Sequence, residues 1–242
     1  MPRYVAYDKN DAHTYALGVF PSMELLDAHP EAVRCLLVSP AGYKNAGVTK
    51  LIERCRALGV RVEEAPRTVE RLSGKENAWA VTVLSKYESP LNPAANHVVL
   101  HNPSDVGNVG TILRSALGFG YENVAIIRPG VDPFDPRVLR ASMGAAFHLN
   151  IVRYDTFDDY LSAAGEREYY LFRLRNAQPL TDQGLRTRAP FSLVFGNEAS
   201  GLPPELESFG NGVIIAHNHR IDSLNLAVAA GIGLHAFSHA DS

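Results

Sequence analysis

Three polar loops, each following a short apolar run, hold the residues whose types and spacing suit chemistry. The first loop follows His101 and leads through a glycine-containing stretch with Asn108 to Arg114. Glycines permit a tight turn, and Asn108 stands where a helix is expected to begin, as its cap or as a ligand. Arg114 is a polar exception within an otherwise apolar helix, a setting in which a charged group usually has a dedicated partner. The residues leave two alternatives open for Arg114, a structural ion pair and a binder of an oxyanion or phosphate.

The second loop combines small residues, amides and one carboxylate after an apolar run that ends at Phe195. It contains Gly196, Asn197, Glu198 and Gly201. Its exposed backbone suits a nucleotide-like ligand. A capped helix start just after the loop explains the same residues, and the two interpretations can hold together.

The third loop leads from the apolar run 213–216 into a helix rich in small residues. It contains Ser223, Leu224 and Asn225. We expect Asp222 or Ser223 to cap this helix, whose alanines and glycines allow close packing.

Histidine and cysteine give only weak indications of a metal site. His217 and His219 have no third or fourth ligand nearby, and Cys35 and Cys55 form neither a disulfide framework nor a zinc pattern. We therefore predict no metal and two buried, structural cysteines.

The elements that must position the three loops are short apolar runs separated by helical or loop stretches. In the second half of the chain these runs cover residues 97–101, 124–127, 149–154, 169–174, 191–195 and 213–216. Strands that alternate with helices predict a parallel sheet covered on both faces. Ligands on such sheets bind beyond the carboxyl ends of the strands, which is where the polar loops begin.

A domain boundary is predicted where Pro90 and Pro93 follow an apolar run. It divides the chain into a small α/β domain, residues 1–88, and a larger domain, residues 89–242. In the first, residues 35–38 and 60–62 are typical of short strands, and between them an apolar stripe at 48–58 predicts a helix that stops before a glycine.

Composition indicates an ordinary globular protein of 242 residues, 46% of them hydrophobic, which is enough to bury a sizeable core. The start of the chain lacks a secretory pattern, and no stretch approaches the roughly 18 apolar residues of a membrane span. We expect a cytoplasmic protein with no membrane partner.

Charge is distributed unevenly along the chain. The formal net charge of −3 argues weakly against a protein that coats nucleic acid. Between residues 44 and 75, however, eight bases face four acids, whereas residues 91–242 carry 11 bases and 15 acids. This asymmetry suits RNA capture by the first part and a small-molecule site in the second, although a solvated helix explains the basic stretch equally well.

Taken together, the three loops resemble the motifs of the SPOUT superfamily, and within it those of the TrmH-like RNA ribose methyltransferases. Segments 102–120, 194–202 and 214–232 are similar to the three family motifs in order and spacing. The resemblance implies an α/β fold whose parallel sheet carries a C-terminal deep trefoil knot, preceded by a small α/β substrate-binding domain. It also implies S-adenosylmethionine as methyl donor, rRNA or tRNA as substrate, 2′-O-ribose methylation and a homodimer.

The resemblance also assigns roles to single residues. It makes Arg114 the catalytic arginine, with Asn108 and Glu198 as active-site support and Ser223 and Asn225 as a catalytic polar pair. The cofactor-binding residues that it implies are Phe195, Gly196, Asn197, Gly201, Ile215 and Leu224. Because guanidinium groups stay protonated in proteins, we expect Arg114 to stabilise a developing alkoxide or the adjacent phosphate rather than to act as a base.

The third motif departs from the family pattern, and two other classes of protein compete with the methyltransferase. Ala216 and His217 stand where the family usually has proline and methionine, so the cofactor pocket is expected to differ there. A Gly-x-Gly-x-x-Ala run at Gly231 would suit an oxidoreductase, but it lies inside a helix near the chain end and is treated as chance. A non-catalytic RNA-binding protein that retains the knotted fold is the second rival, and the presence of the implied catalytic residues argues against it.

Overall fold

The computed structural model describes residues 4–74, 78–180, 190–218 and 220–238, and the chain divides into two compact units. Unit 1 comprises Met1–Tyr87 and Asp132–His148, and unit 2 comprises Glu88–Val131 and Leu149–Ser242. In the described part of the chain, no helix is long and apolar enough to cross a membrane.

Unit 1 is built on a four-stranded sheet in the order β1-β4-β2-β3. The strands are β1 (His13–Leu17), β2 (Val33–Val38), β3 (Val62–Glu64) and β4 (Ala80–Ser85). β4 runs antiparallel to β1 and β2, and β3 runs parallel to β2. The helical elements of the unit are α1 (Val19–Ala28), η1 (Pro30–Ala32), η2 (Pro40–Gly42), α2 (Ala46–Ala57), α3 (Pro66–Ser73), α5 (Pro136–Ala141) and η3 (Ala145–His148). The strand predicted at 35–38 and the helix predicted at 48–58 correspond to β2 and α2, whereas the strand predicted at 60–62 shares only Val62 with β3.

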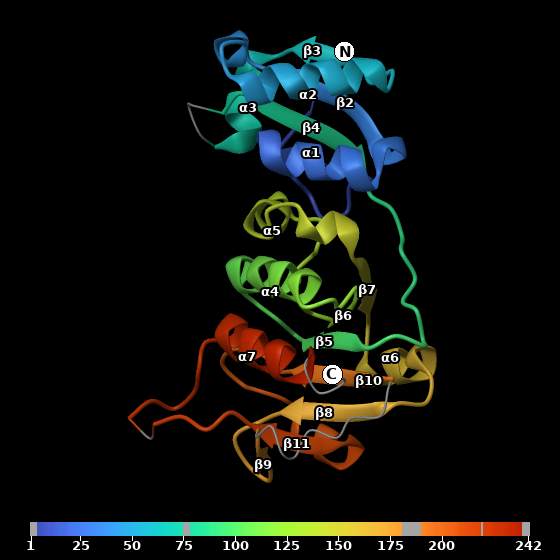
Figure 1. Cartoon of the computed structure of the whole chain (residues 1–242), viewed down its shortest axis with the longest axis vertical. Coiled ribbons are helices and arrows are strands. Elements are labelled where there is room, and N and C mark those ends of the chain that lie inside the picture. The colour runs from blue at the N-terminus through green and yellow to red at the C-terminus, as the bar shows by residue number, and fades with distance from the viewer. Residues whose placement is uncertain (1–3, 75–77, 181–189, 219, 239–242) are drawn as a thin grey trace. The chain divides into compact units, whose positions relative to one another are not determined.

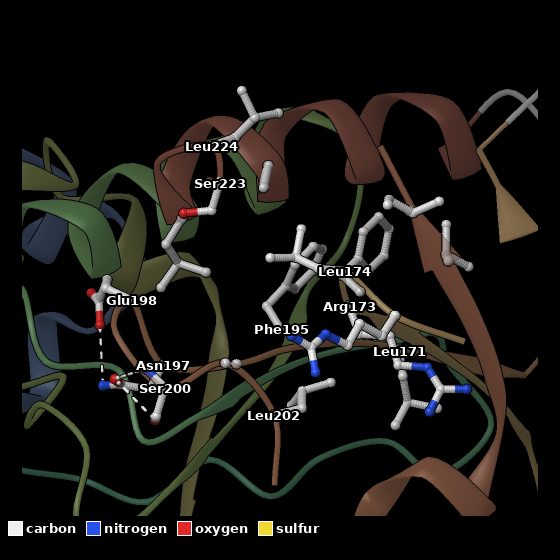
Figure 2. A pocket seen from close by; sticks show the side chains of 18 of the residues that line it. Leu171, Arg173, Leu174, Phe195, Asn197, Glu198, Ser200, Leu202, Ser223 and Leu224 are labelled. Carbon is white, nitrogen blue, oxygen red and sulfur yellow. Dashed lines mark hydrogen bonds between the residues drawn. The ribbon is translucent and has the colours of Figure 1, made fainter. Parts of the chain in front are cut away.

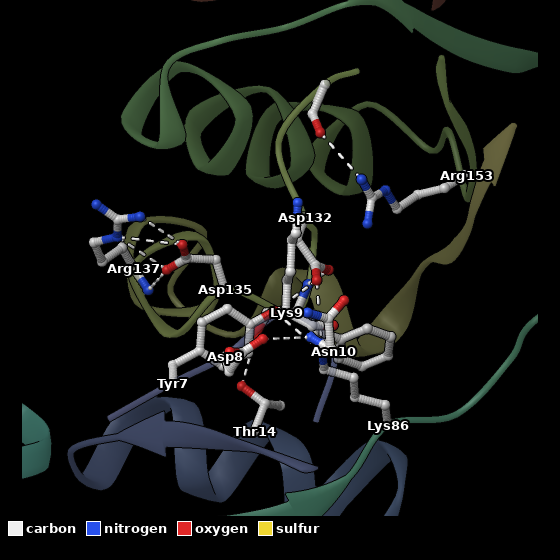
Figure 3. Close-up of polar contacts among 12 residues, drawn as sticks. Tyr7, Asp8, Lys9, Asn10, Thr14, Lys86, Asp132, Asp135, Arg137 and Arg153 are labelled. Atoms are coloured by element: carbon white, nitrogen blue, oxygen red, sulfur yellow. Dashed lines mark hydrogen bonds and ion pairs between the residues drawn. The ribbon is translucent and has the colours of Figure 1, made fainter. Parts of the chain in front are cut away.

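The segment 132–148 packs with unit 1 although it lies far along the chain. Figure 3 shows Asp132 beside Tyr7, whose hydroxyl donates to its carboxylate at 2.6 Å, with Lys86 3.5 Å from the same carboxylate. The buried Thr14 of β1 donates to the carbonyl of Phe134 at 2.6 Å. The sequence placed this segment in the second domain. The predicted domains, 1–88 and 89–242, stay a prediction.

Unit 2 is built on a seven-stranded sheet in the order β7-β6-β5-β10-β8-β11-β9. The strands are β5 (His97–His101), β6 (Asn123–Ile127), β7 (Asn150–Tyr154), β8 (Glu168–Phe172), β9 (Gln178–Pro179), β10 (Phe191–Phe195) and β11 (Asn211–Ile214). Every neighbouring pair is parallel, which confirms the predicted parallel sheet. The order is interleaved, because β10 lies between β5 and β8 and the chain then passes to β11 on the far side of β8.

Helices cover both faces of this sheet (Figure 1). α4 (Val106–Gly118) and α7 (Leu226–Ser238) lie side by side on one face, and α6 (Phe157–Ala164) lies on the other. η4 (Pro204–Phe209) contributes Leu206 to the core on the α6 side. α7 approaches the sheet closely through Gly233, since a Cβ there would lie 2.5 Å from the Phe172 ring. The expected close packing of this small-residue helix is therefore observed.

Candidate active site

The three polar loops meet at the carboxyl ends of β5, β10 and β11, as the sheet topology predicts. A cavity of about 450 Å³ opens there, with Ser223 and Leu224 on one side and Arg173 and Leu202 on the other (Figure 2). The lining includes all six residues that the sequence assigned to the cofactor, Phe195, Gly196, Asn197, Gly201, Ile215 and Leu224. Their role in binding a cofactor stays a prediction, but their convergence on one cavity is a fact of the fold.

The second loop doubles back on itself immediately after β10. Asn197 and Gly201 exchange backbone hydrogen bonds of 3.1 and 2.9 Å, and Gly201 has a φ of 69° that favours glycine. A Cβ on Gly196 would lie 2.3 Å from the carbonyl carbon of Gly201 and 2.4 Å from the nitrogen of Leu202. Because these neighbours are backbone atoms, only glycine fits at position 196.

Asn197 joins the second loop to the first. Its Oδ1 accepts from the nitrogens of Ala199 and Ser200 at 2.9 and 3.1 Å, and its Nδ2 donates to the carbonyl of Asn102 at 2.8 Å. The side chain therefore fixes the shape of its own loop and the approach of the neighbouring one.

Glu198 is the acceptor for a set of donors from the first loop. Its carboxylate accepts from the nitrogen and hydroxyl of Ser104 at 3.1 and 2.7 Å, from the nitrogen of Asp105 at 3.1 Å and from Nδ2 of Asn108 at 3.1 Å. Burial acts to raise the pKa of this carboxyl, but the hydrogen bonds from Ser104 and Asn108 outweigh it and hold the pKa at about 2. Glu198 is consequently an ionised clamp at neutral pH and not a proton donor.

Asn108 and Asn225 continue this chain of hydrogen bonds. Nδ2 of Asn225 donates to Oδ1 of Asn108 at 3.0 Å, so Asn108 bridges Glu198 and Asn225. Oδ1 of Asn225 accepts from the nitrogens of Ala227 and Val228 at 2.9 and 3.3 Å and thereby caps α7.

Both helix caps differ from the sequence interpretation. α4 begins at Val106, and its cap is Asp105, whose carboxylate accepts from the nitrogen of Asn108 at 2.7 Å. The cap of α7 is Asn225 and not Asp222 or Ser223. The reason is common to both helices: several short polar side chains precede each helix, and tertiary hydrogen bonds decide which of them caps it.

Ser223 lines the cavity, is exposed, and its hydroxyl has no hydrogen-bond partner in the described part of the chain. It differs in this respect from Glu198, Asn108 and Asn225, which satisfy one another. Of the sequence-assigned residues in the cavity region, Ser223 is therefore best placed to contact a ligand.

Arg114 lies away from this cluster. The buried residues of α4 are Val109, Gly110, Ile112, Leu113 and Ala116. Arg114 shares the opposite side of the helix with Thr111 and Gly118, is exposed, and does not line the cavity. Among the described residues it has neither an ion pair nor a hydrogen bond, so the ion-pair alternative left open by the sequence is not found.

The sequence interpretation missed one wall of the cavity, which is formed where β8 ends. Leu171, Phe172, Arg173, Leu174 and Arg175 all line the cavity. The run 169–174 was identified as a strand, and the rule that ligands bind beyond strand ends applies to this strand as well. An arginine directly after an apolar strand was the signal that would have found the wall.

In the described ranges, no group of three or more His, Cys, Asp or Glu side chains is suited to a metal, and the absence of a metal stays a prediction. Nδ1 of His217 donates to the carbonyl of Ile215 at 2.8 Å, which orients this ring at the cavity wall. His219 lies outside the described residues.

Comparison with known proteins identifies the family. Residues 95–235 match the SpoU rRNA Methylase family, which is more than half of the chain, and the chain therefore belongs to this family. The resemblance to SPOUT-class RNA methyltransferases inferred from the three loops is confirmed.

Individual relatives agree with this assignment. The chain is similar to the 23S rRNA (guanosine(2553)-2′-O)-methyltransferase RlmP of Bacillus subtilis, with 31% identity over 148 residues that cover 60% of this chain and 58% of the relative. Among solved structures, the AdoMet-bound rRNA methyltransferase from Sinorhizobium meliloti is 27% identical with a TM-score of 0.79, covering 93% of this chain and 87% of that one. AviRb from Streptomyces viridochromogenes in complex with AdoMet, 23% identical over 94% of this chain and 89% of that one, has the same fold at a TM-score of 0.79. The chain spans somewhat over half the length of the first curated relatives that it matches, 55% and 58%.

Proposed function

We propose that this protein is an S-adenosylmethionine-dependent RNA methyltransferase that methylates a ribose 2′-oxygen of rRNA or tRNA. The observation that carries the proposal is the cavity at the carboxyl edge of the unit 2 sheet, where all six residues assigned to the cofactor converge beside the Glu198 cluster. Family membership supports the reaction, and the similarity to RlmP, a 2′-O-methyltransferase, supports the ribose oxygen as acceptor.

The residues of the cavity fit the cofactor. Apolar side chains of the second loop, Leu202, and of the third loop with the start of α7, Leu224 and Leu226, provide surfaces for an adenine ring. The Arg173 guanidinium lines the same cavity and, among the described residues, makes only long contacts with Glu207, which suits a ligand with an anionic group. When bound, the cofactor supplies an electrophilic methyl group on a sulfonium.

The residues of this chain position the acceptor and stabilise charge. Glu198, ionised at neutral pH, holds Asn108 and the first loop, and Asn108 in turn holds Asn225 at the start of α7. This arrangement fixes the first loop and Asn225 of the third loop, and Ser223 of the third loop contacts the substrate through its hydroxyl, which has no partner among the described residues. Glu198 is excluded as the general base because its low pKa makes it a weak proton acceptor.

Arg114 acts as an electrostatic clamp on the developing alkoxide or the adjacent phosphate, as inferred from the family resemblance. Since it faces away from the cavity of its own chain, we propose that it serves the cavity of a second copy in a homodimer. Two apolar side chains of the neighbouring α7, Val228 and Ile232, are 51% and 39% exposed and would be covered by such a partner.

Three finer features complete the proposal. The interleaved order of β10, β8 and β11 is consistent with a deep trefoil knot in unit 2, as the family resemblance implies. The basic stretch of residues 44–75 supports RNA capture by unit 1. A cytoplasmic location stays a prediction.

A methyl-transfer assay with tritiated S-adenosylmethionine against total rRNA and tRNA, followed by nuclease mapping, tests the proposed function. We expect incorporation at one ribose. RNA binding without incorporation would instead favour the non-catalytic RNA-binding protein.

Arg114→Ala tests the clamp in the same assay. We expect the rate to fall at least about hundredfold, which is typical for removal of one transition-state contact. Cofactor binding measured by calorimetry and the unfolding temperature should stay unchanged, because Arg114 has no partner within the described chain. Arg128→Ala, which removes another exposed positive charge, is the control. An unchanged rate for Arg114→Ala would refute the assignment.

A further inference from the structure

Arg173 is a charged side chain in the cavity that the three-loop interpretation does not use. It directly follows β8, and its backbone nitrogen donates to the carbonyl of Val213 on β11 at 3.0 Å, so its position is fixed by the sheet. Its side chain is only 13% exposed and lines the cavity (Figure 2).

The guanidinium of Arg173 has more donors than partners. Nε is buried and has no hydrogen bond. One terminal nitrogen makes long contacts with Glu207, 3.4 Å to the carbonyl and 3.6 Å to the carboxylate, and no partner of the other is found among the described residues. The Glu207 carboxylate is 43% exposed and already accepts from Asn176 at 2.9 Å. A largely buried guanidinium with so few good contacts has capacity for an anion.

The backbone next to Arg173 leaves room for the guanidinium at this place. Gly212 of β11 lies against it, since a Cβ there would be 2.4 Å from Nε and 2.6 Å from a terminal nitrogen of Arg173. Nε is thus covered by the strand, and the terminal nitrogens remain for a ligand in the cavity. The Arg173 guanidinium can occupy this position because residue 212 is a glycine and has no side chain.

We propose that Arg173 binds the carboxylate in the amino-acid part of S-adenosylmethionine and so distinguishes this cofactor from adenosine derivatives that lack a carboxylate. The proposal rests on the proposed function. Adenine, ribose, sulfonium and ammonium are neutral or cationic, and the carboxylate is the one anion of the molecule. The planar fork of an arginine matches a carboxylate with two parallel hydrogen bonds.

Arg175 offers a matched control on the same loop. It also lines the cavity and carries the same charge, but it is exposed and has no hydrogen bond within the described residues. A flexible, solvated arginine loses more conformational freedom on binding and is screened by water, so we assign the carboxylate to Arg173.

Calorimetry with two ligands, S-adenosylmethionine and decarboxylated S-adenosylmethionine, isolates the carboxylate. The wild-type protein should prefer the intact cofactor by about tenfold to hundredfold, the usual range for a hydrogen-bonded charge pair. Arg173→Met should remove this preference by weakening S-adenosylmethionine alone, and decarboxylated S-adenosylmethionine should bind as well as before or more tightly. Arg175→Met should keep the preference.

The outcomes separate this proposal from the proposed function. If the wild-type protein binds both ligands equally, or if Arg175→Met removes the preference, the role of Arg173 is refuted while cofactor binding stands. If neither ligand binds, both proposals fail. If Arg173→Met lowers the unfolding temperature, the deciding variant is Arg173→Lys, which keeps the positive charge without the planar guanidinium. This variant should retain part of the preference for S-adenosylmethionine. An equal loss of affinity for both ligands would refute the proposal.

Discussion

Strands β5 and β10 of unit 2 carry a polar network at each end, and the two networks differ in how completely their hydrogen bonds are satisfied. At the amino end, Nε2 of the buried His97 donates to the carbonyl of Asn92 at 2.8 Å, and Nδ1 accepts from the hydroxyl of Tyr160 at 3.0 Å. Tyr160 in turn lies 2.6 Å from the hydroxyl of Ser192, to which Arg167 donates at 3.3 Å. Each of these side chains has a partner, and none of them lines the large cavity.

At the carboxyl end the Glu198 cluster is also satisfied, but the side chains around it are not. Ser223 has no hydrogen-bond partner within the described residues, and among these residues the guanidinium of Arg173 makes only long contacts, to Glu207. Buried or clustered polar groups alone therefore do not distinguish a site from a structural network. Unused donors next to a rigid, satisfied frame do, because they are the groups that a ligand can still bind.

The titration behaviour of the two ends also differs. Burial lowers the pKa of His97 to about 4, so the ring stays neutral in the folded protein at neutral pH. At the other end, hydrogen bonds overcome burial and lower the pKa of Glu198 to about 2, so this group stays charged. One end is a buried network built on an uncharged histidine, and the other is an anionic frame that orders donors beside a cavity.

The largest effect is expected from Gly196→Ala at the open end. The new Cβ would meet backbone atoms of Gly201 and Leu202 at 2.3 and 2.4 Å, and the backbone has to move. We expect a loss of more than about 3 kcal/mol in the free energy of S-adenosylmethionine binding, roughly hundredfold in affinity, measured by calorimetry.

Gly118→Ala in α4 is the matched control for this substitution. A Cβ there meets nothing within 4 Å, and alanine is the better helix former, so stability should stay equal or rise by up to about 1 kcal/mol. If Gly196→Ala bound the cofactor as tightly as Gly118→Ala, the tight second loop would not shape the site.

Much of this arrangement could be predicted from the sequence, because it depends on patterns of neighbouring residues. The apolar runs gave the main strands of the unit 2 sheet, and the rule for parallel sheets placed the three polar loops at one edge. The features of the fold that the sequence did not predict depend on contacts between residues far apart in the chain. The packing of 132–148 on unit 1 rests on Tyr7 and Thr14, more than a hundred positions away.

Arg114 illustrates the same limit on a single helix. Its neighbours in sequence are apolar, which predicted a buried charge with a partner. The helical period of 3.6 residues instead places it with Thr111 and Gly118 on the exposed side, and the buried side is complete without it. Assigning each residue of the helix to its buried or exposed side, by the helical period, would have predicted that Arg114 is exposed.

The second prediction concerns acid sensitivity at the closed end. His97 has a folded pKa near 4 and an ordinary value of 6.5, so protons favour the unfolded chain between these values. Its contribution is complete above pH 6.5 and is lost as pH falls toward 4, by about 3 kcal/mol in total. His97→Gln should abolish this loss, so its urea-unfolding free energy should fall less steeply than that of the wild type from pH 7 to pH 4.

An exposed histidine supplies the control for that titration. His235→Gln, which removes an exposed imidazole, is the control variant and is compared with His97→Gln over the same pH range. Parallel wild-type and His97→Gln curves would mean that the buried network does not resist protonation, and the contrast between the two ends would be lost.

The smallest effect is expected from Glu198→Gln, in a different pH window. The amide keeps one acceptor oxygen but turns an NH₂ group toward the donors on Ser104 and Asp105, which should cost about 1–2 kcal/mol of unfolding free energy at pH 7 for a partly exposed group.

The pH dependence of this cost follows from the pKa of the Glu198 carboxyl, which is about 2 in the folded protein against an ordinary 4.5. The contribution of the carboxylate to the unfolding free energy is therefore present above pH 4.5 and is lost as pH falls toward 2. The difference in unfolding free energy between wild type and Glu198→Gln should therefore shrink below pH 4.5 and be constant from pH 5 to pH 7. Glu122→Gln, at an exposed position, is the control variant for the loss of one carboxylate. A Glu198→Gln difference that changed between pH 5 and pH 7 would contradict an ionised clamp.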